Sequence, residues 1–306
     1  MMLFKKKTAE NAEDHSQRHK QHAANNSVIA ALGLTTFKII VGISTGSLGI
    51  LAEAAHSALD FVAAAMTAIA VRFSGRPADK EHPYGHGKIE NLSALFETLL
   101  LLITCFWIIG AAVERVHSGK LDIEINIWSF IVMIASIIVD ISRSRMLSRA
   151  AKKYNSQALE ADALHFSTDI WSSLVVLLGL FCVKLHDFFP AYKFLHLADS
   201  LAAIGVGMIV IFLSMKLGAR TISALLDAAP AGLEKKVTSV VEAVPGVANC
   251  HHVRIRSSGP QLFIDLHVLV DGGQNLRMAH KLTEEIEEAI QKIAPNADIT
   301  VHPEPD

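Results

Sequence analysis

Two histidines of this 306-residue chain each precede an aspartate by four positions, inside otherwise apolar stretches. The first pair is His56 and Asp60, and the second is His165 and Asp169. Positions i and i+4 share one face of a helix, so each pair presents an imidazole and a carboxylate in the same direction. If the two faces meet, they offer two nitrogen and two oxygen ligands, which is a set that suits zinc.

The alternative for each pair is a buried hydrogen-bonded network that only fixes helix packing. A carboxylate at the centre of a membrane helix costs about 2.5–3.5 kcal/mol on insertion scales. Asp60 and Asp169 both carry this cost in stretches that could have been purely apolar. Two matching pairs therefore favour a metal site over a packing device.

A second group of ligand-type residues lies in a polar segment after the first pair. Asp79, His82 and His86 have i, i+3, i+7 spacing, and the nearby glycines would let the backbone fold around an ion. The alternative is a solvated loop. A metalloprotease motif is excluded, because it requires glutamate directly after the first histidine and Pro83 stands there.

The C-terminal part holds a third group, for which scattered surface histidines are the alternative. Strand alternation places His267 on the face opposite Leu266 and Val268. Cys250 could add a soft ligand, but we expect it to be buried. The group consists of His251, His252, His267, His280, His302 and Glu304.

Composition indicates a membrane portion followed by a polar portion. Hydrophobic residues make up 51% and charged residues 19%, against roughly 25% charged in an ordinary soluble domain. The net charge of -2 gives no indication of nucleic-acid binding, and three widely spaced cysteines predict no disulfide framework. Six stretches are long enough to span a bilayer. They are residues 27–49, 51–73, 90–113, 125–146, 159–183 and 199–226.

Basic residues predict the orientation of these six spans. The loops after the second and fourth spans are rich in Lys and Arg, whereas the other three are poor. The positive-inside rule then places the rich loops and both termini in the cytoplasm. The first span has no signal-peptide features and is read as a retained helix. The residues counted in the rich loops are Arg72, Arg76, Lys80, Lys88, Arg143, Arg145, Arg149, Lys152 and Lys153.

The last 80 residues alternate between amphipathic helices and strands. Helices are expected at 233–244 and 276–293, and strands at 253–256, 262–270 and 299–302, with a hairpin turn at 257–260. The order αββαβ predicts a small cytoplasmic α+β domain. The expected organisation is a cytoplasmic N-terminal segment (1–26), a six-helix transmembrane domain (27–226) and a cytoplasmic metal-binding regulatory domain (227–306).

These residues resemble those of the cation diffusion facilitators, and within that family the YiiP-type bacterial zinc/proton antiporters. The resemblance covers residues 27–306. It depends on the paired His-x3-Asp motifs, the loop His-Pro-Tyr-Gly-His-Gly-Lys-Ile-Glu (82–90), and the Arg-Ser-Ser-Gly-Pro hairpin (256–260) followed by Phe-Ile-Asp-Leu-His (263–267). The implied fold is a six-transmembrane-helix bundle with a metallochaperone-like C-terminal domain.

The resemblance also implies residue roles. The transport site would be His56, Asp60, His165 and Asp169. The loop site would be Asp79, His82 and His86. A binuclear zinc cluster at a dimer interface would use His251, His267, His280, His302 and Glu304. A charge interlock between the two domains would be formed by Lys88 and Asp227.

Two positions depart from the usual YiiP-type pattern. His56 stands where Asp is usual, as in family members with stricter zinc preference, and Glu304 stands where Asp is usual. A His-rich stretch between the fourth and fifth spans, which many eukaryotic members have, is absent, so we expect a bacterial source.

The expected function is zinc/proton antiport across the inner membrane by a homodimer, with cadmium, iron or cobalt as alternative substrates. No enzymatic activity is expected. The alternative from another class is a membrane-anchored sensor or chaperone-docking protein that binds zinc without moving it. An intramembrane hydrolase is less favoured, because no nucleophile or general base accompanies a three-ligand metal site with an open position.

Overall fold

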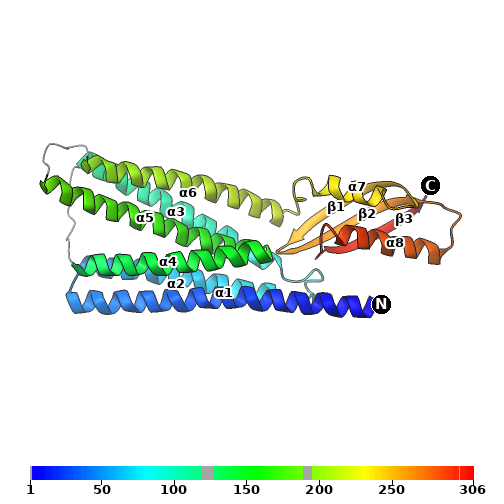
Figure 1. The fold of residues 1–306 in the computed structure, drawn as a ribbon, viewed down its shortest axis with the longest axis horizontal. Coiled ribbons are helices and arrows are strands. Elements are labelled where there is room, and N and C mark those ends of the chain that lie inside the picture. Colours follow the sequence, from blue (N-terminus) through cyan, green and yellow to red (C-terminus); the bar gives the residue numbers. More distant parts are fainter. Residues whose placement is uncertain (1, 119–126, 189–194, 296) are drawn as a thin grey trace.

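Six long helices form a bundle, and a small α+β domain follows at one end of it (Figure 1). This computed structural model describes residues 2–118, 127–188, 195–295 and 297–306. The bundle helices are α1 (Met2–Thr45), α2 (Leu48–Ser74), α3 (Lys88–Ser118), α4 (Ile127–Tyr154), α5 (Gln157–Phe188) and α6 (Leu195–Leu225).

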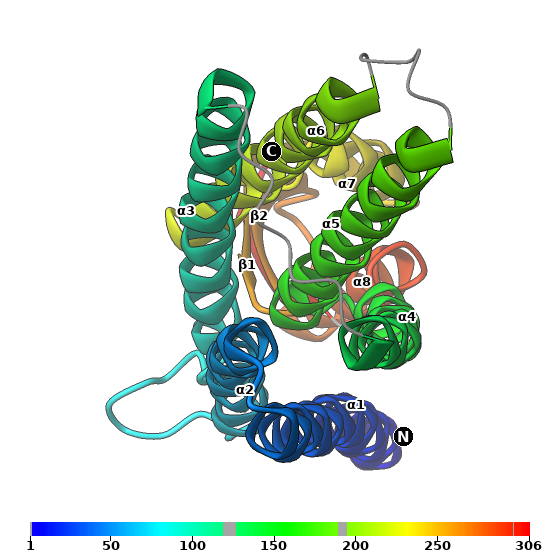
Figure 2. The same cartoon turned by 90° about the vertical axis from the view of Figure 1, so that its left-hand side faces the viewer.

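The bundle can be seen end-on in Figure 2, where α1 lies beside α2 and α5 lies between α4 and α6. Among the described residues, five of the six helices contain segments that are long and apolar enough to cross a membrane. The exception is α5, which carries Glu160, Asp162, His165 and Asp169 in its first half. The predicted helical membrane domain is confirmed, while the sixth span stays a prediction.

Helix α1 begins far earlier than its apolar stretch does. Residues 2–26, which the sequence predicts as a polar segment, continue the same helix. Lys20 in this extension is buried, and its Nζ lies 2.6 Å from Oε1 of Glu90 at the start of α3. The part of the extension around Lys20 is therefore packed against the bundle.

The basic residues assigned to a loop after the fourth span lie on a helix instead. Helix α4 continues to Tyr154, so Arg143, Arg149 and Lys153 all belong to its second half. Arg143 is buried and does not face a loop at all. The apolar stretch ended earlier than the helix because charged residues can continue a helix beyond the hydrocarbon layer.

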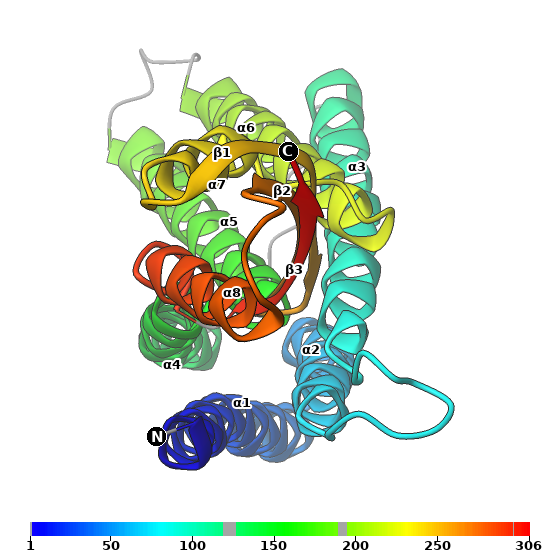
Figure 3. The same cartoon turned by 90° about the vertical axis from the view of Figure 1, so that its right-hand side faces the viewer.

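The C-terminal domain has the predicted αββαβ order. Its elements are α7 (Leu233–Glu242), β1 (Val247–Ser258), β2 (Gln261–Val270), α8 (Leu276–Gln291) and β3 (Ala297–Pro305). Strand β2 is central, antiparallel to β1 and parallel to β3 (Figure 3). Ile264, Leu266 and Val268 of β2 pack with apolar residues of α7 and α8, so the opposite face of the sheet carries the polar residues.

The β1–β2 hairpin tip contacts the bundle at the start of α3. The backbone N–H of Gly259 donates a hydrogen bond to Oδ1 of Asn91 at 3.0 Å. The Lys88 Nζ lies 2.9 Å from Oδ1 of Asp227, which is the ion pair that the resemblance implies as a charge interlock. The small domain is thus attached to the bundle through α3 and the end of α6.

Gly87 permits this close approach. A Cβ at Gly87 would overlap the carbonyl oxygen of Ser258, which belongs to the hairpin backbone and cannot easily move. We expect Gly87→Ala to separate the hairpin from α3 and to speed amide hydrogen exchange at Gly259 by at least about tenfold, since exchange follows local opening.

The matched control is Gly33→Ala, because a Cβ at Gly33 meets nothing within 4 Å. Hydrogen exchange measured by mass spectrometry on a peptide spanning residues 256–262 reports the effect. Equal exchange in the Gly87 variant and the control would show that the hairpin contact is not close in solution.

Candidate metal sites

The two His-x3-Asp pairs meet inside the bundle, one from α2 and one from α5. The Nε2 atom of His165 lies 3.2 Å from Oδ1 of Asp60 and 3.6 Å from Oδ2 of Asp169. The Nε2 atom of His56 lies 3.9 Å from the same oxygen of Asp60. The ligand atoms of His56, Asp60 and Asp169 also lie within 4.8 Å of one another.

These separations suit a shared ion. Two ligands bound at about 2.0–2.2 Å in a tetrahedron lie roughly 3.3–3.6 Å apart. His165 is buried and its partners are half-buried, so an ion here would be largely removed from water. The structure thus brings together the four residues that the sequence predicts.

A buried lysine of α1 lies near this cluster, and the sequence alone does not predict its position there. The Nζ atom of Lys38 lies 2.8 Å from Oγ of Ser57 and 3.2 Å from Oε2 of Glu53. Ser57 directly follows His56, so the contact fixes the orientation of α2 at the site. A lysine within an apolar helix is the only signal in the sequence, and it does not reveal its partner.

Two carboxylates on the other side of the cluster are also buried. Thr67 donates a hydrogen bond to Oε1 of Glu97, and Ser27 donates one to Oδ2 of Asp162 at 3.4 Å. The second oxygen of each carboxylate has no hydrogen-bond partner among the described residues. These two oxygens are therefore where a proton or a water molecule would bind.

Arg143 of α4 supplies the positive charge in this region. Its guanidinium donates to Ser27 and lies 3.4 Å from the carboxylate of Asp140, and its Cζ lies 3.4 Å from the centre of the Phe166 ring. Phe166 neighbours His165 in the chain, so the cation helps to hold this turn of α5. Periodicity alone treats Arg143 as a loop residue and does not reveal this role.

The loop group also gathers as predicted. Oδ1 of Asp79 lies 3.5 Å from Nδ1 of His82, and Oδ2 of Asp79 lies 3.4 Å from Nε2 of His86. The backbone N–H of His82 donates to the Asp79 carboxylate and holds its pKa below the ordinary value. An ionised carboxylate with two imidazoles can bind a divalent cation near neutral pH.

This loop is attached to the C-terminal domain by an aromatic contact. The guanidinium of Arg256 in β1 lies 3.7 Å from the centre of the Tyr84 ring, and Tyr84 meets Phe263 of β2 edge-on with ring centres 5.2 Å apart. Tyr84 lies between the two loop histidines in the sequence, so the loop that carries the second metal group is in direct contact with the small domain.

Glu304 lies at the centre of the third group. Oε1 of Glu304 accepts from Nδ1 of His267 at 2.7 Å, and Oε2 lies 3.2 Å from Nε2 of His251. His302 is more distant, with its Nε2 3.8 Å from Oε1. The hydrogen bond from His267 holds the pKa of Glu304 below its ordinary value, so this carboxylate is ionised at neutral pH.

Strand pairing explains why these residues meet. His251 is paired with His267 across β1 and β2, and His267 is paired with His302 across β2 and β3. Cys250 is buried as expected, within the apolar core of the domain, and burial raises the pKa of its thiol to about 11.

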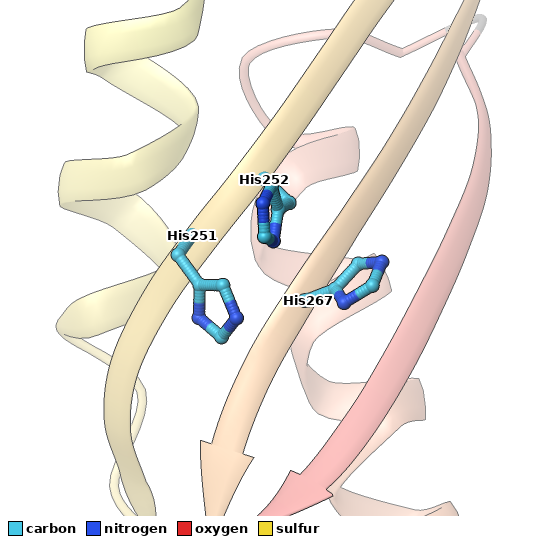
Figure 4. Close-up of side chains that lie close together, drawn as sticks. All are labelled: His251, His252 and His267. Atoms are coloured by element: carbon cyan, nitrogen blue, oxygen red, sulfur yellow. The ribbon is translucent and has the colours of Figure 1, made fainter.

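Two further histidines of the domain do not lie where the sequence predicts them. His280 on α8 is exposed and pairs with Glu284, apart from the group around Glu304. His252, to which the resemblance assigned no role, lies close to His251 and His267 (Figure 4). Sequence alternation alone would have turned His252 away from its neighbour.

Comparison with known proteins covers nearly the whole chain. Residues 26–226 match the family described as the cation efflux transmembrane domain, and residues 229–306 match the cation efflux protein cytoplasmic domain. The MamM CTD resembles the small domain at 25% identity, covering 24% of this chain and 94% of that one, with a TM-score of 0.23.

Several full-length relatives are bacterial cation-efflux pumps named FieF. The pump of Pectobacterium atrosepticum is 30% identical over 296 residues, covering 95% of this chain and 94% of that protein. The pump of Yersinia enterocolitica is 31% identical, covering 92% of each chain. With both family regions matched in order and a polar ligand cluster inside an apolar bundle, this chain belongs to the cation diffusion facilitator family of divalent-cation efflux transporters.

Proposed function

We propose that the protein exports zinc in exchange for protons, using the site formed by His56, Asp60, His165 and Asp169. The observation that carries this proposal is the convergence of two imidazoles and two carboxylates from α2 and α5 within the bundle. Ligands inside the helix bundle suit an ion that crosses the membrane, if α5 is the sixth span that the sequence predicts.

Proton coupling follows from the ligand chemistry. Imidazoles and carboxylates bind metal only when deprotonated, so zinc binding releases protons and acidity lowers zinc affinity. A site that opens alternately to each side would then bind zinc where protons are scarce and release it where they are abundant. An inward proton gradient would in this way drive zinc outward.

His56 supports zinc as the physiological metal. An imidazole in place of a carboxylate oxygen makes the ligand set softer, which disfavours manganese and other ions that prefer oxygen. Cadmium, iron and cobalt remain candidate substrates that a nitrogen–oxygen site can hold.

We expect His56→Asp to broaden selectivity toward cadmium. The variant restores the carboxylate that is usual at this position in YiiP-type relatives. Initial rates of zinc and cadmium uptake, measured side by side in proteoliposomes, check the ratio. His22→Asp serves as the control, since His22 is an exposed histidine of α1 outside the cluster. An unchanged cadmium-to-zinc ratio in His56→Asp would count against the role of His56.

The proposed assembly is a homodimer in the inner membrane, with both termini in the cytoplasm. The matching cytoplasmic-domain family and the bacterial relatives support this assignment. Helix α1 starts at the end of the bundle that carries the C-terminal domain, in agreement with an even number of spans (Figure 1).

The group around Glu304 is proposed to regulate transport. Cytoplasmic zinc bound there would draw the two small domains together and favour transport. We expect His267→Ala combined with His302→Ala to abolish zinc-dependent compaction, measured by small-angle X-ray scattering, and the associated rise in transport rate. Compaction that persists in this variant would contradict the regulatory role.

Vesicle flux tests the function itself. Proteoliposomes containing the purified protein should accumulate zinc when their lumen is made acidic, and accumulation should stop when an ionophore collapses the gradient. A protein that only senses zinc, or docks a zinc chaperone, would bind the metal without any gradient-dependent accumulation.

A further inference from the structure

Strand β1 contains one residue more than its partner at the centre of the third metal group. Across from β2, His251 pairs with His267 and Arg254 pairs with Asp265. Two residues of β1 therefore oppose Leu266 alone. The extra residue is His252, whose φ of 48° lies in the left-handed region that few non-glycine residues adopt, asparagine, aspartate and histidine being the most frequent of them.

The bulge changes the direction of the His252 side chain. In a regular strand, His251 and His252 would point to opposite faces. Here His252 is exposed, while Val253 packs against the core in its place. The rings of His251, His252 and His267 gather on one side of the sheet (Figure 4), with ring centres 5.0 Å apart for the first two and 5.2 Å apart for the last two.

Ligand atoms of these three histidines lie within 4.8 Å of one another. Glu304 contacts two of the three, since its carboxylate lies 2.7 Å from His267 and 3.2 Å from His251. In addition, Nδ1 of His251 is buried and has no hydrogen-bond partner among the described residues. A strained residue, converging imidazoles and an unsatisfied nitrogen together indicate a binding site rather than a surface cluster.

We propose that His252 is a metal ligand, which together with His251, His267 and Glu304 forms a complete zinc site within a single protomer. Three imidazoles and one carboxylate supply four ligands of the types that bind zinc, which is the number a tetrahedral site needs. The nitrogen-rich set selects zinc, nickel or copper over calcium, magnesium and manganese. This inference rests on the proposal that the third group regulates transport, and it adds which residues bind the first ion.

An intraprotomer site changes what zinc would do here. If the first ion needs no residue of a second copy, its affinity is independent of dimerisation, and His280 plays no part in it. The ligand atoms of His267, His302 and Glu304 also lie within 4.8 Å of one another, and His302 is largely exposed, so this second group could hold a second ion that a partner completes. Zinc would thus order each small domain before it joins two of them.

The test uses the full-length chain in detergent with Asp60→Ala and Asp79→Ala, which remove a carboxylate from each of the other two sites. Zinc affinity is measured by competition with a chelating dye. The central variant is His252→Asn, because asparagine tolerates the left-handed conformation and the bulge is preserved. His252→Gly is the second variant, and it also keeps the backbone conformation. The matched control is His280→Asn.

The expected result is a loss of affinity for the tightest zinc ion of at least about tenfold in both His252 variants, since even an outer-sphere partner of a metal contributes 10–100-fold. The His280→Asn variant should bind zinc as tightly as the parent protein, at protein concentrations both above and below the concentration at which the protein dimerises. Parent-like affinity in either His252 variant would overturn the inference, and so would an equal loss in His280→Asn.

The proposed transport function has a separate readout. Zinc flux in vesicles uses the protein without the two background substitutions. If flux is absent while the His252 variants lose zinc affinity, the transport proposal fails and the intraprotomer site stands. If flux is present while those variants keep their affinity, the site fails and transport stands.

Discussion

Replacing Asp60 by alanine is expected to reduce zinc uptake into proteoliposomes to the rate of protein-free vesicles. Asp60 is the residue that contacts both histidines of the cluster, at 3.2 Å from His165 and 3.9 Å from His56. Its loss removes one of two negative charges, so an ion with two charges would be left with a single carboxylate in the middle of the bundle.

The control is the neighbouring position. Leu59→Ala changes a side chain that is 69% exposed on the outside of the bundle, and it should transport zinc at a rate close to that of the unaltered protein. Asp60→Asn keeps the volume and the helix packing, and it should be as inactive as the alanine variant. Zinc flux that survives in both Asp60 variants would remove this residue from the transport site.

The second large effect concerns stability rather than transport. Glu90 is fully buried, accepts hydrogen bonds from Ser74 and Ser156, and forms the ion pair with Lys20 of the α1 extension. Glu90→Ala leaves the Lys20 ammonium buried without its partner, which typically costs about 3–5 kcal/mol. We therefore expect a large fall in unfolding temperature in detergent, measured by intrinsic tryptophan fluorescence.

Glu160→Ala is the matched control, because Glu160 pairs with Arg220 where both side chains are about half exposed. Such pairs contribute about 0–1 kcal/mol, so the control should unfold near the temperature of the unaltered protein. Lys20→Met combined with Glu90→Ala should recover part of the loss, since it removes the unpaired charge. Similar unfolding temperatures for the Glu90 and Glu160 variants would show that the α1 extension is not held by a buried ion pair.

Local patterns in the sequence predict the helices and the ligand pairs well. The His-x3-Asp spacing places His56 beside Asp60 and His165 beside Asp169, because residues four positions apart lie on the same face of a helix. That the two pairs meet depends on the packing of α2 against α5, which the shared polar stripe of the two helices indicates. Strand alternation likewise predicts the position of His267.

Other features depend on contacts that are distant in the chain. Lys20 meets Glu90 across 70 residues, and Lys38 meets Ser57 across a helical hairpin. Residues of a buried ion pair that are far apart in the chain leave no periodic pattern in the sequence. The sequence therefore shows two charged residues but not that they meet. The bulge at His252 is a departure from alternation, and its presence depends on the register between β1 and β2 rather than on residue type.

The central claim is that one ion is held jointly by α2 and α5. X-ray absorption at the zinc edge tests this most directly, on a full-length variant in which Asp79→Ala, His251→Ala and His267→Ala remove ligands of the other two groups. The claim predicts one bound zinc with two imidazole nitrogens and two carboxylate oxygens. A variant that holds no zinc, or zinc with fewer than two imidazoles, would contradict it.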